Sequence, residues 1–522
     1  MKRKIIASLI AVLGSVVLFF VGCAVVMFLA PGTEIFGVRY VASGLSQCDV
    51  KQTLESFSGD VYVETSKVPI QINFGNYNYG VEFRQNFIGF TKSKDKKASL
   101  SVSYDQSRNL HIKANEIQEF VYSQKSDPFY HFVLNLPHSY FNDGNRSITI
   151  KSKSSSVQIS GNANLKNFTV ETNGALSFGE ESKVLVKDVY KCQTNKLVEI
   201  GENIECFSAD IYSTGNSIIF KKPMLGNIKA KTKGGDLKFI SCENLEFHST
   251  SGSVKTYGEG LNEVRKNVYV STNGGSVQLG NINSSVYGLA QANIDGNAIT
   301  TVVETVGGSI KIAKMHTGEV RSSRGRINVD EAIDITLEEK TGDIVIKKVL
   351  SRLVVKGRNG RVTAGEDGAI CNPQISTTSG VITVYNSSGD VIIKSSSNNV
   401  TLVNSDSQNI NLHSGKNLVA ENLMGNVEAY AKGNIDLFFK EFSGDVKVST
   451  GTKAKHVEID LLCSKLSEVN YDLKSTKSKK AKVYVMGELV DEGTNLASNV
   501  KEGKFGVSVE TSYAVITLKL GE

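Results

Sequence analysis

The sequence contains no tryptophan and only 6 prolines in 522 residues, although it contains 47 glycines. Glycine without proline is typical of tight turns rather than of a disordered linker, so many short connections are expected. The formal net charge is only +6, and basic residues alternate with acidic ones along most of the chain. This field is too weak to predict a nucleic-acid-binding protein.

The cysteines form no Cys-x-x-Cys pair and have no histidines at metal-ligand spacing. A zinc site or a disulfide framework is therefore not expected, and most of these thiols are predicted to be small buried side chains. One disulfide, Cys192 to Cys206, stays open as an alternative outside the cytoplasm. The seven cysteines are Cys23, Cys48, Cys192, Cys206, Cys242, Cys371 and Cys463.

Common catalytic patterns are also absent. The 7 histidines never stand at His-x-His or His-Glu-x-x-His spacing, and there is no Gly-x-Ser-x-Gly elbow, P-loop or dinucleotide fingerprint. This argues against the commonest hydrolases, NTPases and oxidoreductases. We therefore predict a protein that is not an enzyme, with no catalytic residues, no cofactor and no metal ligands.

Residues 5–30 carry no charge and follow Lys2, Arg3 and Lys4. At ~1.5 Å per residue this stretch gives a helix of about 39 Å, enough to cross a hydrocarbon core of roughly 30 Å. The positive-inside rule predicts a cytoplasmic N-terminus and an extracytoplasmic body in the cell membrane. A cleaved secretory signal and a lipoprotein signal at Cys23 stay open as alternatives.

The body repeats a short unit in which Gly is followed by a small, polar or charged residue and then by an aliphatic residue that opens a strand. The period is about 17–20 residues with a half-period near 9, and such units must stack on their neighbours to bury an apolar face. This predicts a β-solenoid, with an array of β-sandwiches as the alternative. The units begin at Gly59-Asp60, Gly235-Asp236, Gly252, Gly275, Gly308, Gly325, Gly342-Asp343, Gly360, Gly389-Asp390, Gly425, Gly433 and Gly444-Asp445.

These Gly and Asp residues are interpreted as structural. Glycine, asparagine and aspartate tolerate the left-handed backbone of a tight turn, and an Asp carboxylate can accept hydrogen bonds from turn N–H groups. Stacked turn carboxylates that bind calcium are the alternative, although the Gly-Gly-x-Gly-x-Asp calcium repeat is absent.

The predicted fold is all-β: a single-stranded β-solenoid (β-helix) with β-rich caps, preceded by one N-terminal transmembrane helix. A short helix is expected near Leu461–Leu466, within the C-terminal cap. The predicted segments are a cytoplasmic basic tail at 1–4, a transmembrane signal anchor at 5–30, a linker at 31–47, an N-terminal β cap at 48–145, solenoid repeats at 146–455 and a C-terminal cap at 456–522.

Three features together resemble a family of bacterial adhesin-like β-solenoids, which are extracytoplasmic domains of envelope proteins. The features are the strand Phe132–Pro137 that ends in Leu-Pro, the recurring Ser/Thr-x-Gly-Asp/Ser-Val/Ile turns, and the late strand Val509-Glu510-Thr511. The resemblance covers most of residues 50–520. It implies an adhesion or envelope-related role and provides no active-site residues to transfer.

Two kinds of side chain are candidates for recognition. Aromatic residues such as Tyr77, Tyr79 and Tyr130 can stack on a ligand, with core packing of the N-terminal cap as the alternative. Basic runs at 92–97 and 474–482 suit anionic wall polymers or lipid head groups, with a solvated loop as the alternative.

The predicted function is a membrane-anchored, non-enzymatic cell-surface adhesion or interaction protein. Its expected partners are the membrane, through one N-terminal span, and cell-wall polymers, glycans or surface proteins, without nucleic acid. One alternative is a self-associating envelope scaffold or envelope-stress component. The other is a carbohydrate-active β-helix enzyme, which would need acids and bases from successive coils in one groove.

Overall fold

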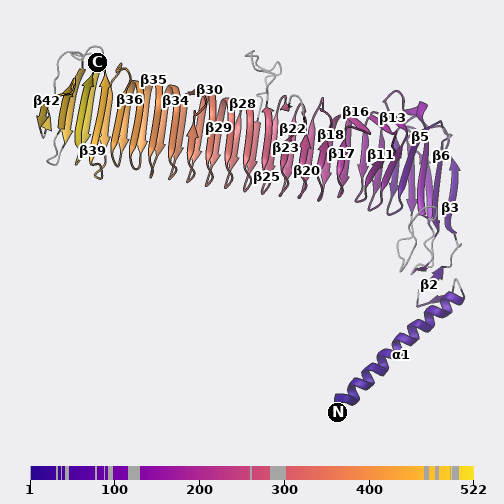
Figure 1. Cartoon of the computed structure of the whole chain (residues 1–522). Helices are drawn as coiled ribbons and strands as arrows, with labels where there is room; N and C mark the ends of the chain where they lie inside the picture. Colours follow the sequence, from indigo (N-terminus) through magenta and orange to yellow (C-terminus); the bar gives the residue numbers. More distant parts are fainter. Residues whose placement is uncertain are drawn as a thin grey trace. The chain divides into compact units, whose positions relative to one another are not determined.

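The computed structural model describes residues 2–30, 33–36, 38–41, 46–76, 79–86, 89–91, 98–115, 130–258, 262–282, 301–463, 469–475, 481–493, 495–496 and 505–521. They form one long helix followed by stacked β-strands (Figure 1). The predicted fold class is confirmed, since the strands make a β-solenoid of about 15 turns after an apolar N-terminal helix. The chain divides into two compact units, Met1–Thr232 and Lys233–Glu522.

The N-terminal helix α1 (Lys2–Leu29) contains a stretch, Ser8–Leu29, that is long and apolar enough to cross a membrane or to serve as a signal anchor. Its mean hydropathy is 2.8. Large aliphatic side chains such as Leu18 and Leu29 are exposed along it, which fits a lipid environment. Part of the predicted linker then forms a small antiparallel sheet of β1 (Glu34–Ile35), β2 (Val38–Val41) and β7 (Gly89–Thr91).

The remaining strands of the first unit form its part of the solenoid and its cap. They are β3 (Ser46–Thr53), β4 (Val61–Thr65), β5 (Ile70–Gly75), β6 (Gly80–Asn86), β8 (Ser99–Tyr104), β9 (Leu110–Asn115), β10 (Tyr130–Pro137), β11 (Ile148–Ser152), β12 (Val157–Ser160), β13 (Asn162–Leu165), β14 (Phe168–Glu171), β15 (Leu176–Phe178), β16 (Lys183–Thr194), β17 (Val198–Ile200), β18 (Ile204–Ser213), β19 (Ile218–Phe220) and β20 (Ile228–Thr232), with a 3-10 helix at His138–Phe141.

The N-terminal cap is not stacked in chain order. Strand β4 pairs in parallel with β11 on one side and with β9 on the other, while β5 lies between β12 and β10. The chain therefore completes the β4–β5 coil, leaves it, adds β9–β10 on its outer side, and continues at β11–β12 on its inner side. Strands β6 and β8 close the outer side with antiparallel pairs.

The second unit is a longer stack of coils. Its strands are β21 (Leu237–Phe239), β22 (Leu245–Ser249), β23 (Val254–Thr256), β24 (Glu263–Val264), β25 (Val268–Thr272), β26 (Val277–Ile282), β27 (Thr301–Thr305), β28 (Ile310–Ser322), β29 (Ile327–Glu339), β30 (Ile344–Gly357), β31 (Val362–Ala364), β32 (Ile370–Cys371), β33 (Pro373–Thr377), β34 (Ile382–Ser395), β35 (Val400–Ser414), β36 (Leu418–Ala431), β37 (Ile435–Phe439), β38 (Val446–Thr450), β39 (His456–Leu462), β40 (Val469–Ser475), β41 (Ala481–Val485), β42 (Glu488–Gly493), β43 (Asn495–Leu496), β44 (Phe505–Thr511) and β45 (Val515–Gly521).

Each coil of this unit adds one layer to the stack. Ile310 pairs with Ile327 and Ile327 with Ile344, a repeat of 17 residues, whereas Ile382, Val400 and Leu418 follow at 18. A long strand such as β28 holds two apolar segments joined by a bend, here called the mid-coil bend, and ends in a tight corner turn that leads to the next coil. Alternating positions point inward, so like side chains stack on one another, and each fully buried aliphatic contributes about 1.5–3 kcal/mol.

A buried hydroxyl closes most corner turns. The hydroxyl of Thr305 donates to the carbonyl of Gly275 at 3.1 Å and accepts the N–H of Gly308 at 3.0 Å, and Thr272 repeats the arrangement one coil earlier. The side chain thus ties its own turn to the preceding one. The same buried position holds Thr272, Thr305, Ser322, Thr377, Ser395 and Ser414.

The corner glycines allow two backbones to approach closely. A Cβ added to Gly275 or Gly308 would lie 2.0 Å from the carbonyl oxygen of the glycine one coil earlier. Neither residue has a positive φ. The prediction of a left-handed backbone at these turns is therefore wrong. Glycine is required there because the stacked turns leave no room for a side chain. Gly252, Gly325, Gly342, Gly360 and Gly380 meet the preceding glycine in the same way.

The C-terminal cap also departs from chain order. After β38–β39 the chain forms β40–β41, and the C-terminal strands β44–β45 then insert between these two layers, parallel to both. Strand β42 closes the outer side by pairing antiparallel with β41. The prediction of a short helix near Leu461–Leu466 is wrong for its first two residues, because Leu461 and Leu462 belong to β39. Residues 464–468 lie outside the described part.

Candidate functional site

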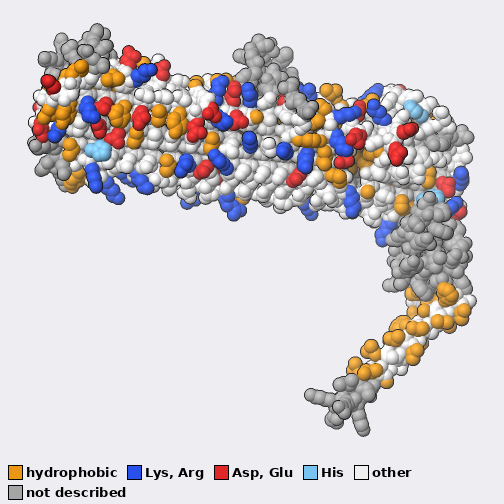
Figure 2. Space-filling model, in the orientation of Figure 1, with side chains coloured by type: hydrophobic (Ala, Val, Ile, Leu, Met, Phe, Trp, Pro, Cys, Tyr) orange, Lys and Arg blue, Asp and Glu red, His pale blue; other side chains and the backbone are white. Residues whose placement is uncertain are grey.

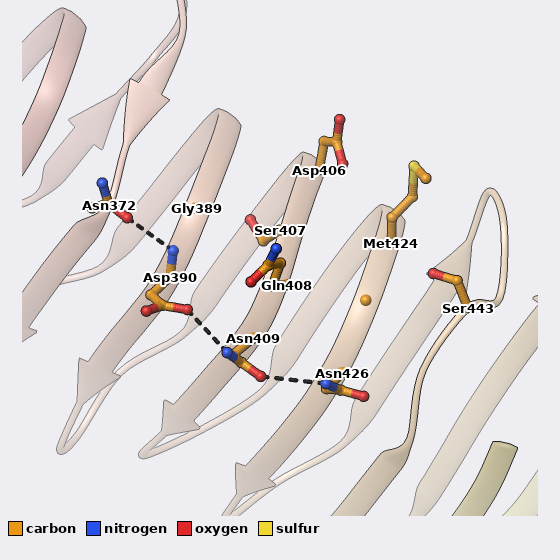
Figure 3. A pocket seen from close by; sticks show the side chains of 11 residues that line it. Asn372, Gly389, Asp390, Asp406, Ser407, Gln408, Asn409, Met424, Asn426 and Ser443 are labelled. Atoms are coloured by element: carbon orange, nitrogen blue, oxygen red, sulfur yellow. Dashed lines mark hydrogen bonds between the residues drawn. The ribbon is translucent and has the colours of Figure 1, made fainter. Parts of the chain in front are cut away.

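A groove of about 790 Å³ runs across the mid-coil bends of β34, β35 and β36 (Figure 3). Its lining side chains are polar except for one methionine, and two glycines complete it. The lining residues are Asn372, Gly389, Asp390, Asp406, Ser407, Gln408, Asn409, Met424, Gly425, Asn426 and Ser443.

A β-bulge shapes the groove. Asp406 pairs with Met424 and Asn409 pairs with Asn426, so Ser407 and Gln408 stand opposite the single residue Gly425. The same pair stands opposite Gly389 on the other side, because Ser388 pairs with Asp406 and Asp390 with Asn409. An extra residue in the middle strand pushes its bend outward and re-aims its side chains. Gly389 and Gly425 face the bulge with φ of 77° and 96°, where a left-handed backbone does require glycine.

One side of the groove is a ladder of side-chain hydrogen bonds. Asn372 accepts the N–H of Asp390 at 3.0 Å, the amide of Asn409 donates to the Asp390 carboxylate at 3.0 Å, and the amide of Asn426 donates to Asn409 at 3.3 Å (Figure 3). Asn426 then accepts the N–H of Asp445 at 2.9 Å. These contacts hold the polar groups of adjacent coils in a fixed row.

Two lining side chains remain available to a ligand. Asp406 and Gln408 are exposed and make no side-chain hydrogen bond with any described residue. Beneath them a buried hydroxyl chain, Ser387 to Ser405 to Ser407, links successive oxygens at 2.8 Å and fixes the bulge from inside. The groove therefore offers a free carboxylate and a free amide above a rigid polar floor.

A second row of asparagine side chains lies at the start of the same mid-coil bends. Asn386, Asn404 and Asn422 adopt φ of 51°, 59° and 56°, a left-handed backbone that asparagine tolerates. The amide of Asn404 donates to the side-chain oxygen of Asn386 at 3.1 Å, and that of Asn422 donates to Asn404 at 2.8 Å. The amide of Asn386 donates to the backbone carbonyl of Gly365 at 2.9 Å. The position of the bends is thus set by backbone conformation as well as by the side-chain row.

The predicted repeat-turn residues separate into two columns. Asp236 and Asp343 lie at corner turns, where each carboxylate accepts a backbone N–H from the next coil, at 2.8 Å from Ser253 and 2.9 Å from Arg361. Asp390 and Asp445 lie at mid-coil bends, and Asp60 of the first unit accepts the N–H of Ser147 at 2.7 Å. The half-period near 9 reflects these two columns. The corner column contains Gly235, Gly252, Gly275, Gly308, Gly325 and Gly342, whereas Gly59, Gly389 and Gly444 precede second segments.

Glu339 occupies a corner position where other coils have Ser or Thr. Its side chain is only 3% exposed, and neither carboxylate oxygen has a hydrogen-bond partner in good geometry among the described residues. Burial raises the pKa of this carboxyl, and the nearby N–H groups of residues 340–342 offset the effect only in part. This coil therefore lacks the corner hydroxyl of its neighbours, and the buried carboxyl of Glu339 in its place destabilises the stack.

Replacement of Glu339 by Thr is expected to raise the free energy of unfolding at pH 7.5 by about 1 kcal/mol, because the hydroxyl restores a satisfied corner. Since the folded pKa is raised, wild-type stability is full below the unfolded value of 4.5 and falls as pH rises through the folded value. The advantage of Glu339→Thr should therefore be larger at pH 7.5 than at pH 4.5 in thermal unfolding. Glu338→Thr, which removes a half-buried, ion-paired carboxylate, should give no gain.

The aromatic candidates belong to the N-terminal cap. Tyr79 packs against Phe57 and Tyr140 with ring centroids 5.5 and 5.8 Å apart, and Tyr140 donates to the carbonyl of Phe57. Tyr79 is thus part of a packed cluster. Tyr77 and most of the two basic runs lie outside the described residues, and the side chain of Tyr130 does too.

Thiols and possible metal ligands are dispersed. Cys192 and Cys206 are free, and burial raises their pKa to about 11 and about 12, which keeps both thiols protonated and unreactive. Within the described ranges, no three His, Cys, Asp or Glu side chains are grouped as a metal site would require.

Sequence reasoning placed Asp390 and, through the Gly425 unit, Asn426 at repeat turns, but missed Asn372, Asp406 and Gln408. The usable signal was spacing: Asp390 to Asn409 is 19 residues and Asn409 to Asn426 is 17, while the neighbouring apolar positions repeat at 18. A spacing one residue longer than 18, followed by a spacing one residue shorter, indicates an extra residue, a β-bulge, in the coil between them.

Comparison of the chain with protein-family models, curated proteins and solved structures finds no match. The resemblance to adhesin-like β-solenoids therefore stays a prediction.

Proposed function

We propose that this chain is a membrane-anchored, non-enzymatic interaction protein whose solenoid lies outside the cytoplasm and binds a polar, hydroxyl-rich ligand at the cell surface. The observation that carries the proposal is the groove, where a free carboxylate and a free amide stand above an ordered row of Asn and Asp side chains. Carboxylate and amide groups pair with hydroxyls as both acceptors and donors. Glycan chains are the ligand class that this lining fits.

The repetition of the groove supports an extended ligand. Adjacent strands lie ≈ 4.7–4.9 Å apart, so the row from Asn372 to Asn426 presents a polar group at each step of the stack. A linear polymer can follow such a row through several weak contacts, whose affinities combine. Helix α1, with Lys2, Arg3 and Lys4 in its first turn, supplies the proposed anchor with a cytoplasmic N-terminus.

The outer strand of the C-terminal cap weighs against the alternative of a self-associating scaffold. Strand β42 has the sequence Glu-Leu-Val-Asp-Glu-Gly and is mostly exposed. Charged side chains on an outer strand oppose edge-to-edge pairing with another copy. The antiparallel β41–β42 pair also ends the parallel stacking that further coils would continue.

The test uses the full chain in lipid nanodiscs, applied to an array of neutral and acidic polysaccharides. We expect binding to at least one glycan class, and the double variant Asp406→Ala/Gln408→Ala should weaken it at least fivefold, about 1 kcal/mol. The control Glu366→Ala/Gln278→Ala removes an exposed carboxylate and amide outside the groove and should change affinity less than twofold. No binding to any glycan, or equal losses in both variants, would contradict the proposal.

A further inference from the structure

Three consecutive corner turns of the second unit carry an unusual concentration of positive charge. The turns are 323–326, 340–343 and 358–361, and they follow β28, β29 and β30. Only one acidic residue, Asp343, lies on them. We call their basic side chains the basic ridge; its members are Arg324, Arg326, Lys340, Arg358 and Arg361.

Strand pairing places these residues side by side. Ile327 pairs with Ile344 and Ile344 with Val362, so Arg326, Asp343 and Arg361, which each precede one of them, occupy one column. Backbone hydrogen bonds join the turns directly. The N–H of Arg358 donates to the backbone carbonyl of Glu339 at 3.0 Å, and the N–H of Asn359 donates to that of Lys340 at 3.1 Å. With strands ≈ 4.7–4.9 Å apart, the ridge spans roughly 10 Å along the stack.

Most basic residues on the strands of the same coils are ion-paired, with Lys311 on β28 as the exposed exception. Arg321 lies in a column with Glu304 and Glu338 and contacts them at 3.0 and 3.5 Å, and Lys356 contacts Glu338 at 3.5 Å. Arg352 likewise contacts Asp334 at 3.2 Å. In-register pairing of opposite charges thus leaves this strand face nearly neutral.

The ridge residues have no such partners. None of the five forms an ion pair with a side chain in the described part of the chain. Two carboxylates belong to these turns or precede them directly, and neither forms an ion pair with the five: one oxygen of Asp343 accepts the Arg361 N–H, and Glu339 is buried. Figure 2 shows Lys and Arg side chains projecting from the lower edge of the second unit.

The ridge is also sharply bounded. The preceding corner turn is Val306-Gly307-Gly308-Ser309 and the following one is Thr378-Ser379-Gly380-Val381, and neither carries a charge. An even spread of lysines for solubility would not produce a patch confined to three coils. Four of the five residues are arginines, whose planar guanidinium binds phosphate or carboxylate in a bidentate manner.

We propose that the basic ridge binds a linear polyanion, a polymer that carries phosphate or carboxylate groups, at a site separate from the polar groove. Several adjacent anions of one chain contact the five cations together. Each exposed pair contributes little, so affinity comes from the combined contacts and falls steeply with salt.

The test measures binding of long-chain polyphosphate and of polygalacturonate to the full chain in nanodiscs of zwitterionic lipid. We expect binding of one or both at 50 mM NaCl, with at least tenfold weaker binding at 300 mM. The polymer that binds identifies the anionic group. The triple variant Arg324→Gln/Arg358→Gln/Arg361→Gln should weaken binding at least tenfold.

The matched control, Lys311→Gln/Lys394→Gln/Lys447→Gln, removes the same charge from exposed, unpaired strand positions of the same unit and should change affinity less than threefold. Equal losses in the two triple variants would overturn the proposal, since only net charge would then matter. Binding of anionic vesicles without binding of either polymer would also overturn it. Glycan binding at the groove should be the same in the ridge variant, which separates the two proposals.

Discussion

Replacement of Gly275 by alanine is expected to lower the free energy of unfolding of the second unit by about 3 kcal/mol or more. The added Cβ would lie 2.0 Å from the carbonyl oxygen of Gly252 and 2.8 Å from the backbone nitrogen of Ser253. Both contacts are with backbone, so no side chain can rotate away, and the two coils must separate. That separation also breaks the hydrogen bond from the Thr272 hydroxyl to the carbonyl of Gly252, which joins the two coils. Thermal unfolding and limited proteolysis near residue 275 would measure the loss.

The adjacent residue provides the control. A Cβ on Gly274 would lie 3.8 Å from its nearest neighbours, and Gly274 does not have a positive φ. Gly274→Ala should therefore leave stability unchanged or raise it by about 0.4–1 kcal/mol, because alanine restricts the unfolded chain. Equal destabilisation by both variants would show that turn flexibility, rather than close stacking, explains the repeated glycine.

Removal of residues 505–522 is expected to unfold the whole C-terminal cap, including strands that remain in the chain. Strands β44 and β45 lie between β38–β39 and β40–β41, so their loss takes away the only layer that joins β40–β41 to the described stack. Five large buried aliphatic side chains are lost, on the order of 10 kcal/mol of apolar burial. They are Val507, Val509, Ile516, Leu518 and Leu520.

Limited proteolysis of the truncated chain should yield a stable fragment that ends near residue 463, because each solenoid coil depends on its neighbours alone. Leu518→Asp should reproduce much of the effect by burying a charge. Leu489→Asp, at a position 48% exposed on the outermost strand, should not. A truncated chain that keeps β40–β41 resistant to protease would contradict the inserted arrangement.

The charge-free stretch after Lys4 and the alternating strands of the body were sufficient to predict an apolar helix and a β-solenoid. Both depend on local patterns, since helix length and the alternation of apolar residues follow from the chain itself. The period could be read for the same reason, because stacked positions such as Ile310, Ile327 and Ile344 require similar side chains at equal spacing.

Only the tertiary structure decided which residues meet between coils. Gly342 and Gly389 look alike in sequence, yet one packs against the backbone of a preceding corner and the other adopts a left-handed bend. The groove depends on one extra residue in β35, and the basic ridge on the alignment of three turns, and a shift of one residue would alter either. The inserted strands of both caps pair with segments distant in the chain. No local pattern determines such pairings. The periodic body and its β-rich caps were therefore predictable, while the strand order within the caps, the groove and the ridge were not.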